Sequence, residues 1–241
     1  MEQFIHKPVP LTVVGGFLGA GKTTLLNHLL RESSGIRFAI LVNDFGDLNI
    51  DESLIASHEG ETISLTNGCI CCSMVDGFIE TMITMMKRID DFDHVVIEAS
   101  GVSEPDRIMD IARLDPELRP NGIIILIDGE HVIKQLEDPH INSIVIKQIR
   151  SADIQIINKS DRISPKELEE LETQIEQTSP SKFRIRAVLG KVPLPLIFGL
   201  FEKNEYWKSK PTLDHSLHQH GISNLPFKNS IAVIIAINIF L

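Results

Sequence analysis

The chain has 241 residues and a mass of 27.0 kDa, with 43% hydrophobic and 23% charged residues, which is typical of a globular protein able to bury a core. Lysine and arginine number 23 against 33 acidic residues, and the net charge of -10 argues against nucleic-acid binding. The opening residues, MEQFIHKPVP, lack a basic start followed by an apolar run, so no secretory signal or membrane partner is expected and the cytoplasm is the default compartment.

Short apolar runs rich in β-branched residues alternate along the chain with segments of helical spacing. The expected strands are 11–16, 38–43, 94–100, 122–128, 152–158 and 184–188. The expected helices follow Gly21 and occupy 75–88, 104–114 and 165–177, the last with Ser164 as N-cap before a proline. Near-continuous apolarity indicates strands buried on both faces, and the alternation predicts an α/β fold with a mostly parallel sheet flanked by helices. Ligands in such sheets bind at the carboxyl ends of the strands.

The pattern changes near residue 203, where polar sequence with the run HSLHQHG begins. The expected divisions are a P-loop domain over 1–202, a histidine-containing linker over 203–229 and an apolar tail over 230–241. The stretch IAVIIAINIFL is too short to span a bilayer, so it predicts a buried strand. We expect it to be the remnant of a truncated second domain.

A phosphate-binding pattern joins the first expected strand to the first helix. Residues 16–23 read GFLGAGKT, which fits G-x-x-x-x-G-K-[ST]. In this pattern backbone N–H groups point at an anion, Lys22 reaches the β- and γ-phosphates, and the Thr23 hydroxyl coordinates Mg²⁺. The alternative is a glycine-rich turn with a surface lysine. The residues expected to contact the nucleotide are Gly16, Gly19, Ala20, Gly21, Lys22, Thr23 and Thr24.

A second motif follows the fifth expected strand, where residues 158–161 read NKSD. The N-K-x-D pattern is typical of guanine recognition, because the Asp161 carboxylate can accept from both N1–H and the 2-amino group of guanine. Asn158 and the stem of Lys159 would hold the loop and cover the ring. Alone the tetrapeptide could be a polar turn, but together with the P-loop it favours GTP over ATP.

Two acidic loops follow the second and third expected strands, NDFGD from Asn43 and EASG from Glu98. Their carboxylates suit Mg²⁺, and Gly101 could present its N–H to a γ-phosphate. Asp44 or Glu98 could orient the attacking water, and the two are not ranked. The alternative is that each loop only caps a helix. The catalytic set is therefore Lys22, Glu98 and Asp44, with Thr23 and Glu98 as magnesium ligands.

All three cysteines fall in the string TNGCICC, as Cys69, Cys71 and Cys72. An odd, clustered number does not form a disulfide framework. A loop at a helix start lowers thiol pKa, and three thiolates can hold zinc with one coordination position left open. Buried structural cysteines and a redox-sensing thiol are the alternatives. The candidates for the fourth ligand, by nearness in sequence, are His58, Glu59 and Asp44.

Three histidines, His215, His218 and His220, stand close together in the polar segment. Their spacing suits a second, weaker metal site. A solvated linker is the alternative.

With these motifs in place, the chain resembles the CobW-type metal chaperone GTPases, relatives of the nickel-insertion GTPases for urease and hydrogenase. The resemblance rests on GGFLGAGKTT, NDFGDLNID, GCICC, EASGVSEP, QIRSADIQIINKSD and the histidine run before HGI, over roughly residues 9–222. It implies a G domain that hydrolyses GTP slowly, binds zinc or a neighbouring metal through the CxCC loop and couples nucleotide state to metal transfer to a client metalloprotein. By position it assigns Lys22 and Thr23 to phosphate and magnesium, Asp161 to the base, Glu98 to the magnesium-linked switch and the cysteines to the metal.

Two departures from the family pattern stand out. Asp44 occupies a position where the family usually has glutamate, and we expect the second α/β domain of the family to be lost after about Lys228. A homodimer is left open. Two other functions remain as alternatives: a P-loop small-molecule kinase, which has no use for CxCC, and a metal- and nucleotide-binding remnant without turnover.

Overall fold

The computed structural model describes residues 8–32, 36–42, 82–83, 85–180, 183–198 and 232–236. The described strands form one sheet in the order β6-β5-β4-β1-β3-β2-β7, and every neighbouring pair is parallel. The strands are β1 (Val9–Gly15), β2 (Phe38–Val42), β3 (His94–Glu98), β4 (Leu118–Asp128), β5 (Ile154–Asn158), β6 (Phe183–Arg186) and β7 (Ala232–Ala236). The predicted α/β fold with a parallel sheet is confirmed.

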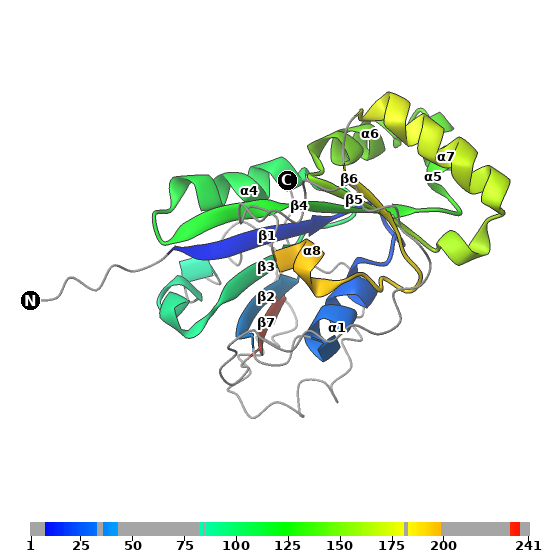
Figure 1. Cartoon of the computed structure of the whole chain (residues 1–241). Helices are drawn as coiled ribbons and strands as arrows, with labels where there is room; N and C mark the ends of the chain where they lie inside the picture. The colour runs from blue at the N-terminus through cyan, green and yellow to red at the C-terminus, as the bar shows by residue number, and fades with distance from the viewer. Residues whose placement is uncertain are drawn as a thin grey trace, which may run out of the picture.

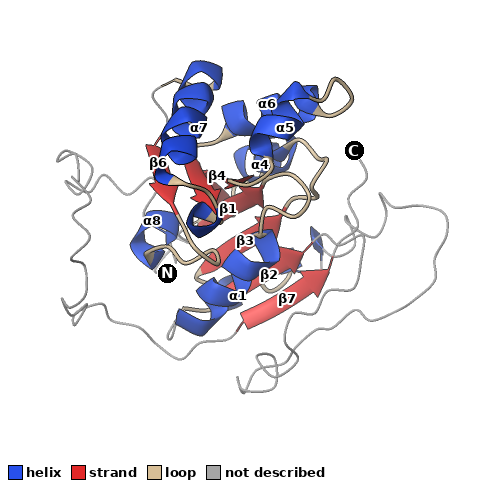
Figure 2. Ribbon diagram, turned by 90° about the vertical axis from the view of Figure 1, so that its right-hand side faces the viewer, coloured by secondary structure: helices blue, strands red, loops and turns tan. Residues whose placement is uncertain are grey.

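Helices cover both faces of this sheet (Figure 1). They are α1 (Lys22–Glu32), α4 (Pro105–Leu114), α5 (Val132–Glu137), α6 (Asn142–Ser151), α7 (Pro165–Thr178) and α8 (Leu194–Phe198), with 3-10 turns η1 (Ile89–Asp91) and η2 (Ser160–Arg162). Residues of α4, α5, α6 and α7 pack in one core cluster, whereas α1 and α8 pack in the other. Figure 2 shows these layers from the side.

The strands are apolar along their length because both of their faces are buried. Val13 of β1 belongs to the α4 side of the core and the next residue, Val14, to the α1 side, and both are fully buried. Successive side chains of a strand point to opposite faces, so a sheet covered on both sides needs apolar residues at consecutive positions. This is the pattern from which the strands were predicted.

Helix α7 begins where its sequence predicted. The Ser164 hydroxyl accepts from the Glu167 N–H at 3.3 Å, and the Glu167 carboxylate accepts from the Ser164 N–H at 2.8 Å. Pro165 occupies the first helical position, where no N–H is needed. This capping box starts the helix in the phase that buries Leu168, Leu171 and Ile175.

The apolar tail contributes β7, which pairs with β2 in the register Phe38↔Ala232 to Val42↔Ala236. A strand was predicted in this tail, and a strand is found. The division of the chain into 1–202, 203–229 and 230–241 stays a prediction. Among the described residues, no helix has both the length and the apolar character needed to cross a bilayer.

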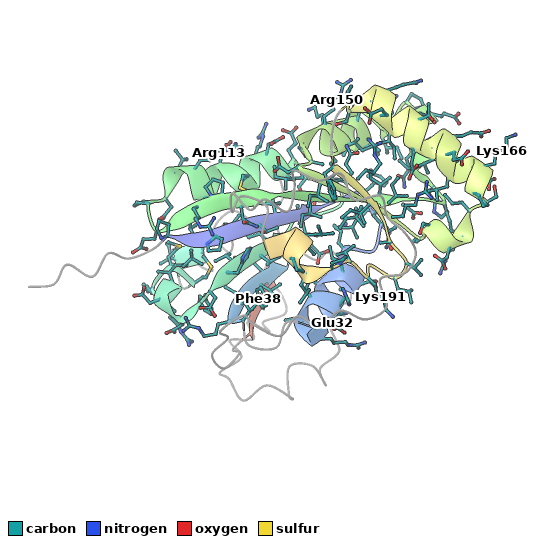
Figure 3. The ribbon with its side chains drawn as sticks, viewed as in Figure 1. Glu32, Phe38, Arg113, Arg150, Lys166 and Lys191 are labelled. Carbon is teal, nitrogen blue, oxygen red and sulfur yellow. The ribbon has the colours of Figure 1, made fainter. Side chains whose placement is uncertain are left out.

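A polar network lies buried on the α1 side of the sheet, near the start of the strands. Asn121 Nδ2 donates to Thr12 Oγ1 at 2.9 Å and to the Ile197 carbonyl at 2.9 Å, and Thr12 Oγ1 lies 2.7 Å from His94 Nε2. Burial lowers the pKa of His94 to about 3, so the ring is neutral, and its Nε2 shares a hydrogen bond with the Thr12 hydroxyl. The ring of Phe38, labelled in Figure 3, lies 6.1 Å from that of His94. The network ties β1, β3, β4 and α8 together.

Candidate functional site

The loop between β1 and α1 is folded as an anion cradle. Lys22 is only 8% exposed, and its Nζ donates to the Gly16 carbonyl at 2.9 Å and reaches the Phe17 carbonyl at 3.4 Å. Gly21 has a φ of +98°, and a Cβ at this position would collide with the Asn158 amide. Only glycine satisfies both conditions. Thr23 and Thr24 lie in the first turn of α1, half-buried and exposed respectively.

Asn158 connects this loop to the end of the sheet beyond β5. It is 2% exposed, and its Nδ2 donates to the Ala20 carbonyl at 2.9 Å. Its Oδ1 accepts from the Gly190 N–H at 2.9 Å. One buried amide therefore joins the P-loop to the segment 187–190 that follows β6, a contact between residues more than a hundred positions apart.

Asp161 lies on the exposed η2 turn directly after Lys159. Lys159 has a left-handed backbone with a φ of 58° and a ψ of 31°, and its Nζ donates to Asp128 Oδ2 at 2.7 Å. Ser160 is anchored as well, because its N–H and hydroxyl donate to the Ala187 carbonyl at 3.2 and 3.0 Å. The turn that carries Asp161 is thus held from two sides.

The segment after β3 packs directly on the P-loop. Glu98 ends β3 and is 4% exposed. A Cβ on Gly101 would come within 2.8 Å of the Leu18 N and side chain, so only glycine permits this approach. Gln148 of α6, 2% exposed, donates through Nε2 to the carbonyls of Gly101 and Ser103 at 3.1 and 3.0 Å. The loop is therefore fixed between the P-loop and α6.

Three contributors to this site were missed by the sequence reasoning: Asp128, Gln148 and the segment 187–190. Asp128 ends an expected strand at the ligand-binding edge, and that position was a signal that could have been used. The segment AVLG follows the sixth strand at the same edge, where Leu189 has a φ of 53° and is 59% exposed. Gln148 carried no signal, since a buried glutamine on a helix looks like any polar surface residue.

A group of possible cation ligands, Asp128, Glu130 and His131, has ligand atoms within 4.8 Å of one another. These carboxylates are already engaged by cations of the protein. Lys159 Nζ lies 2.7 Å from Asp128, and Arg162 Nη1 lies 3.2 Å from Glu130. We interpret the group as an ion-pair cluster.

The structure brings most of the predicted nucleotide residues to one edge of the sheet. The P-loop follows β1, Glu98 ends β3 with Gly101 shortly after it, and Asn158 ends β5 with Lys159 and Asp161 after it. These three strands are parallel and belong to one sheet. The remaining predicted site residues lie outside the described part of the chain. They are Asp44, His58, Glu59, Cys69, Cys71, Cys72, His215, His218 and His220.

Comparison with known proteins agrees with this geometry. Residues 10–185 match the model of the CobW/HypB/UreG nucleotide-binding domain. The chain belongs to this family. It is 32% identical over 223 residues to the "Zinc chaperone CobW" of a Sinorhizobium species, covering 80% of this chain and 62% of that protein.

Two other known proteins are also similar to this chain, one in sequence and one in structure. The "Zinc-regulated GTPase metalloprotein activator 1" of Schizosaccharomyces pombe is 37% identical, over 67% of this chain and 41% of that protein. The crystal structure of the Zn(II)-bound YjiA GTPase from E. coli superposes with a TM-score of 0.61 and 27% identity, covering 81% of this chain and 63% of that chain. The chain therefore spans less than two thirds of the length of these relatives.

Proposed function

We propose that this chain is a GTP-binding and GTP-hydrolysing metallochaperone that binds zinc through the Cys69–Cys72 loop and transfers it to a client metalloprotein. The observation that supports it most is the Asn158 bridge. This side chain joins the P-loop to the 187–190 segment at 2.9 Å on each side, directly before the turn that carries Asp161. A phosphate cradle and a base-reading carboxylate are thereby held at a fixed separation, as a nucleoside triphosphate requires.

Guanine is the base that suits this edge. The Asp161 carboxylate can accept from N1–H and from the 2-amino group of guanine, whereas adenine would leave it unpaired. The exposed turn leaves the carboxylate accessible to a ligand. GTP is therefore the proposed substrate.

Lys22 is poised for the phosphates. Its ammonium bonds the carbonyls of its own loop, and a triphosphate in the cradle would offer it anionic oxygens in their place. The Thr23 hydroxyl and the Glu98 carboxylate are oxygen donors of the kind that Mg²⁺ prefers. Thr23 lies at the start of α1, which follows β1, and Glu98 ends β3, the neighbour of β1 in the sheet, so the residues fit this ion. Bound there, Mg²⁺ would neutralise charge on the β- and γ-phosphates.

The proposed link between nucleotide and metal runs through loops that follow one another in the chain. Asp44, the three cysteines and Glu98 occur in that order after β2 and up to the end of β3. Loss of the γ-phosphate would change the contacts of Gly101, because the backbone of this residue packs directly on Leu18 of the P-loop. Zinc is the proposed cargo, and coordination by three thiolates leaves one position open for its transfer. The proposed compartment is the cytoplasm, where thiols stay reduced.

The experiment that tests this function replaces Cys69, Cys71 and Cys72 together by serine. We expect zinc affinity to fall by at least about a hundredfold, because hydroxyls are poor zinc ligands, and the zinc dependence of GTP hydrolysis to disappear. The GTP affinity measured without zinc should stay unchanged. Equilibrium zinc competition and phosphate release, each with GTP and with ATP, are the measurements. Unchanged zinc affinity and unchanged zinc-dependent hydrolysis in the variant would exclude the chaperone function. Phosphorylation of a small molecule with ATP would favour a kinase, and tight binding without turnover would favour an inactive remnant.

A further inference from the structure

Asp128 is a buried acidic residue at the ligand-binding edge of the sheet. It ends β4 and stands opposite Asn158 of β5 in the strand register. Its side chain is 3% exposed and accepts from Lys159 Nζ at 2.7 Å. Burial alone would raise the pKa of this carboxyl, but hydrogen bonds from Lys159 and His131 lower it below its ordinary value, so Asp128 is ionised at neutral pH.

The partner of this carboxylate has an unusual backbone. Lys159 lies in the left-handed region, with a φ of 58°, directly before the η2 turn. A residue with a Cβ adopts this conformation at a steric cost, and it persists where surrounding contacts hold it. The turn closes through the Arg162 N–H, which donates to the Lys159 carbonyl at 3.0 Å. The direction in which Asp161 is presented therefore depends on what holds Lys159.

We propose that Asp128 is a positioning residue for guanine recognition, which holds Lys159 and thereby fixes the turn that presents Asp161 to the base. This inference rests on the proposed GTP binding and deepens it. Asp128 acts through Lys159 and makes no contact with the base itself.

The surroundings show why the pairing of Lys159 matters. Asp128 and Lys159 line a pocket of about 400 Å³ together with Phe17, Leu18 and Gly19 of the P-loop, so this ion pair lies beside the phosphate-binding loop. Glu130 Oε2 lies 4.0 Å from the same ammonium. If Asp128 lost its charge, Lys159 would be drawn toward Glu130, away from the end of β4. The turn would then lose the contact that holds it through Lys159.

The test compares the affinities of the whole protein for GTP and for inosine triphosphate, which lacks the 2-amino group. Each nucleotide is titrated calorimetrically. The ratio of the two affinities depends on whether the Asp161 carboxylate is placed to accept from the 2-amino group. In the unaltered protein GTP should bind about tenfold more tightly, the typical effect of one hydrogen bond to a charged group. Asp128→Asn should lower this ratio by at least about threefold, toward the value found in Asp161→Asn, where the acceptor itself is removed.

Two further variants exclude a general loss of structure. Glu130→Gln makes the same carboxylate-to-amide change in the same cluster and leaves the 2.7 Å contact intact. It weakens the ion pair of Glu130 with the exposed Arg162 of the turn, and because exposed ion pairs contribute little, the ratio should stay within about twofold of the unaltered protein. The double variant Asp128→Asn with Lys159→Gln leaves no unpaired charge buried, so it serves if Asp128→Asn folds poorly, and it should show the same reduced ratio. Both nucleotides bind the same folded fraction, so partial unfolding cancels from the ratio.

The outcomes separate this inference from the proposed function. A reduced ratio in Asp128→Asn and in the double variant, with Glu130→Gln unchanged, supports the positioning role. An unchanged ratio in Asp128→Asn, an equal loss of both affinities, or an equal effect of Glu130→Gln would overturn it while leaving GTP binding intact. If the unaltered protein binds both nucleotides equally, the guanine reading of the proposed function fails, and this inference fails with it.

Discussion

The buried His94 is expected to make the free energy of unfolding depend on pH below 6.5. Its ring is hydrogen-bonded to the Thr12 hydroxyl at 2.7 Å, and its pKa is lowered from 6.5 to about 3 by burial. In the unfolded chain the ring takes up a proton near pH 6.5, whereas the folded protein does not. His94 therefore leaves the free energy of unfolding at its full value above pH 6.5. Between pH 6.5 and about 3 it lowers that free energy by about 1.4 kcal/mol for each pH unit.

Replacing His94 by glutamine should remove this slope, because an amide does not titrate and can still accept from Thr12. Urea unfolding at pH 7, 6 and 5 measures the difference between the two proteins. The difference between the two proteins isolates the contribution of His94. The buried Asp128 carboxyl, whose pKa lies below its ordinary value of 3.8, changes the free energy of unfolding only at lower pH. Equal slopes in both proteins would show that His94 is protonated in the folded state or accessible to water.

The motif residues of the site could be predicted from the sequence, because their spacing reflects a local requirement. The P-loop pattern, for instance, lies within one strand, one turn and the start of one helix. Asp128 could not be assigned a role in this way, because its role depends on Lys159, a residue brought beside it only by the pairing of β4 with β5. The same holds for the 187–190 segment, which meets Asn158 only in the folded chain.

At the scale of elements, α6 holds the loop after β3 by one buried side chain. Gln148→Leu would leave the carbonyls of Gly101 and Ser103 without their donor and loosen the loop against Leu18. We expect the kcat of GTP hydrolysis to fall by about fivefold or more, with little change in KM, because the nucleotide cradle itself is untouched. Steady-state phosphate release measures both constants.

The matched control comes from the neighbouring residue of the same helix. Lys147 Nζ lies 3.0 Å from Glu104 at the end of the same loop, but both side chains are exposed. Exposed ion pairs contribute little, so Lys147→Gln should leave kcat within about twofold. If both variants behaved alike, or if Gln148→Leu hydrolysed GTP normally, α6 would have no part in holding the loop.

The elements that carry a clear apolar pattern were predicted. The strands agree with expectation because they carry continuous apolar runs, and α1, α4 and α7 agree because their apolar residues recur at helical spacing. Helices α5, α6 and α8 were not predicted. In 132–151 the sequence EDPH interrupts one helical pattern and splits it into two short helices, and α8 has only 5 residues, too few for a periodic signal.

At the scale of the whole molecule, the proposed function requires coupling between the nucleotide-binding edge of the sheet and the cysteine loop. If the nucleotide changes the affinity for zinc, zinc must change the affinity for the nucleotide by the same factor. The described residues supply the nucleotide half of this relation: a cradle held by Asn158, and a Gly101 loop packed on Leu18. The cysteines belong to a part of the chain outside those residues, so their half needs a solution measurement.

The most direct measurement is the zinc affinity of the full chain, by competition with a chromogenic chelator, in the presence of saturating GDP and of a saturating non-hydrolysable GTP analogue. We predict that the two affinities differ by at least about fivefold, which corresponds to a coupling free energy of about 1 kcal/mol. The serine variant of the three cysteines should abolish the difference. Equal zinc affinities in the two nucleotide states, with both nucleotides shown to be bound, would contradict it.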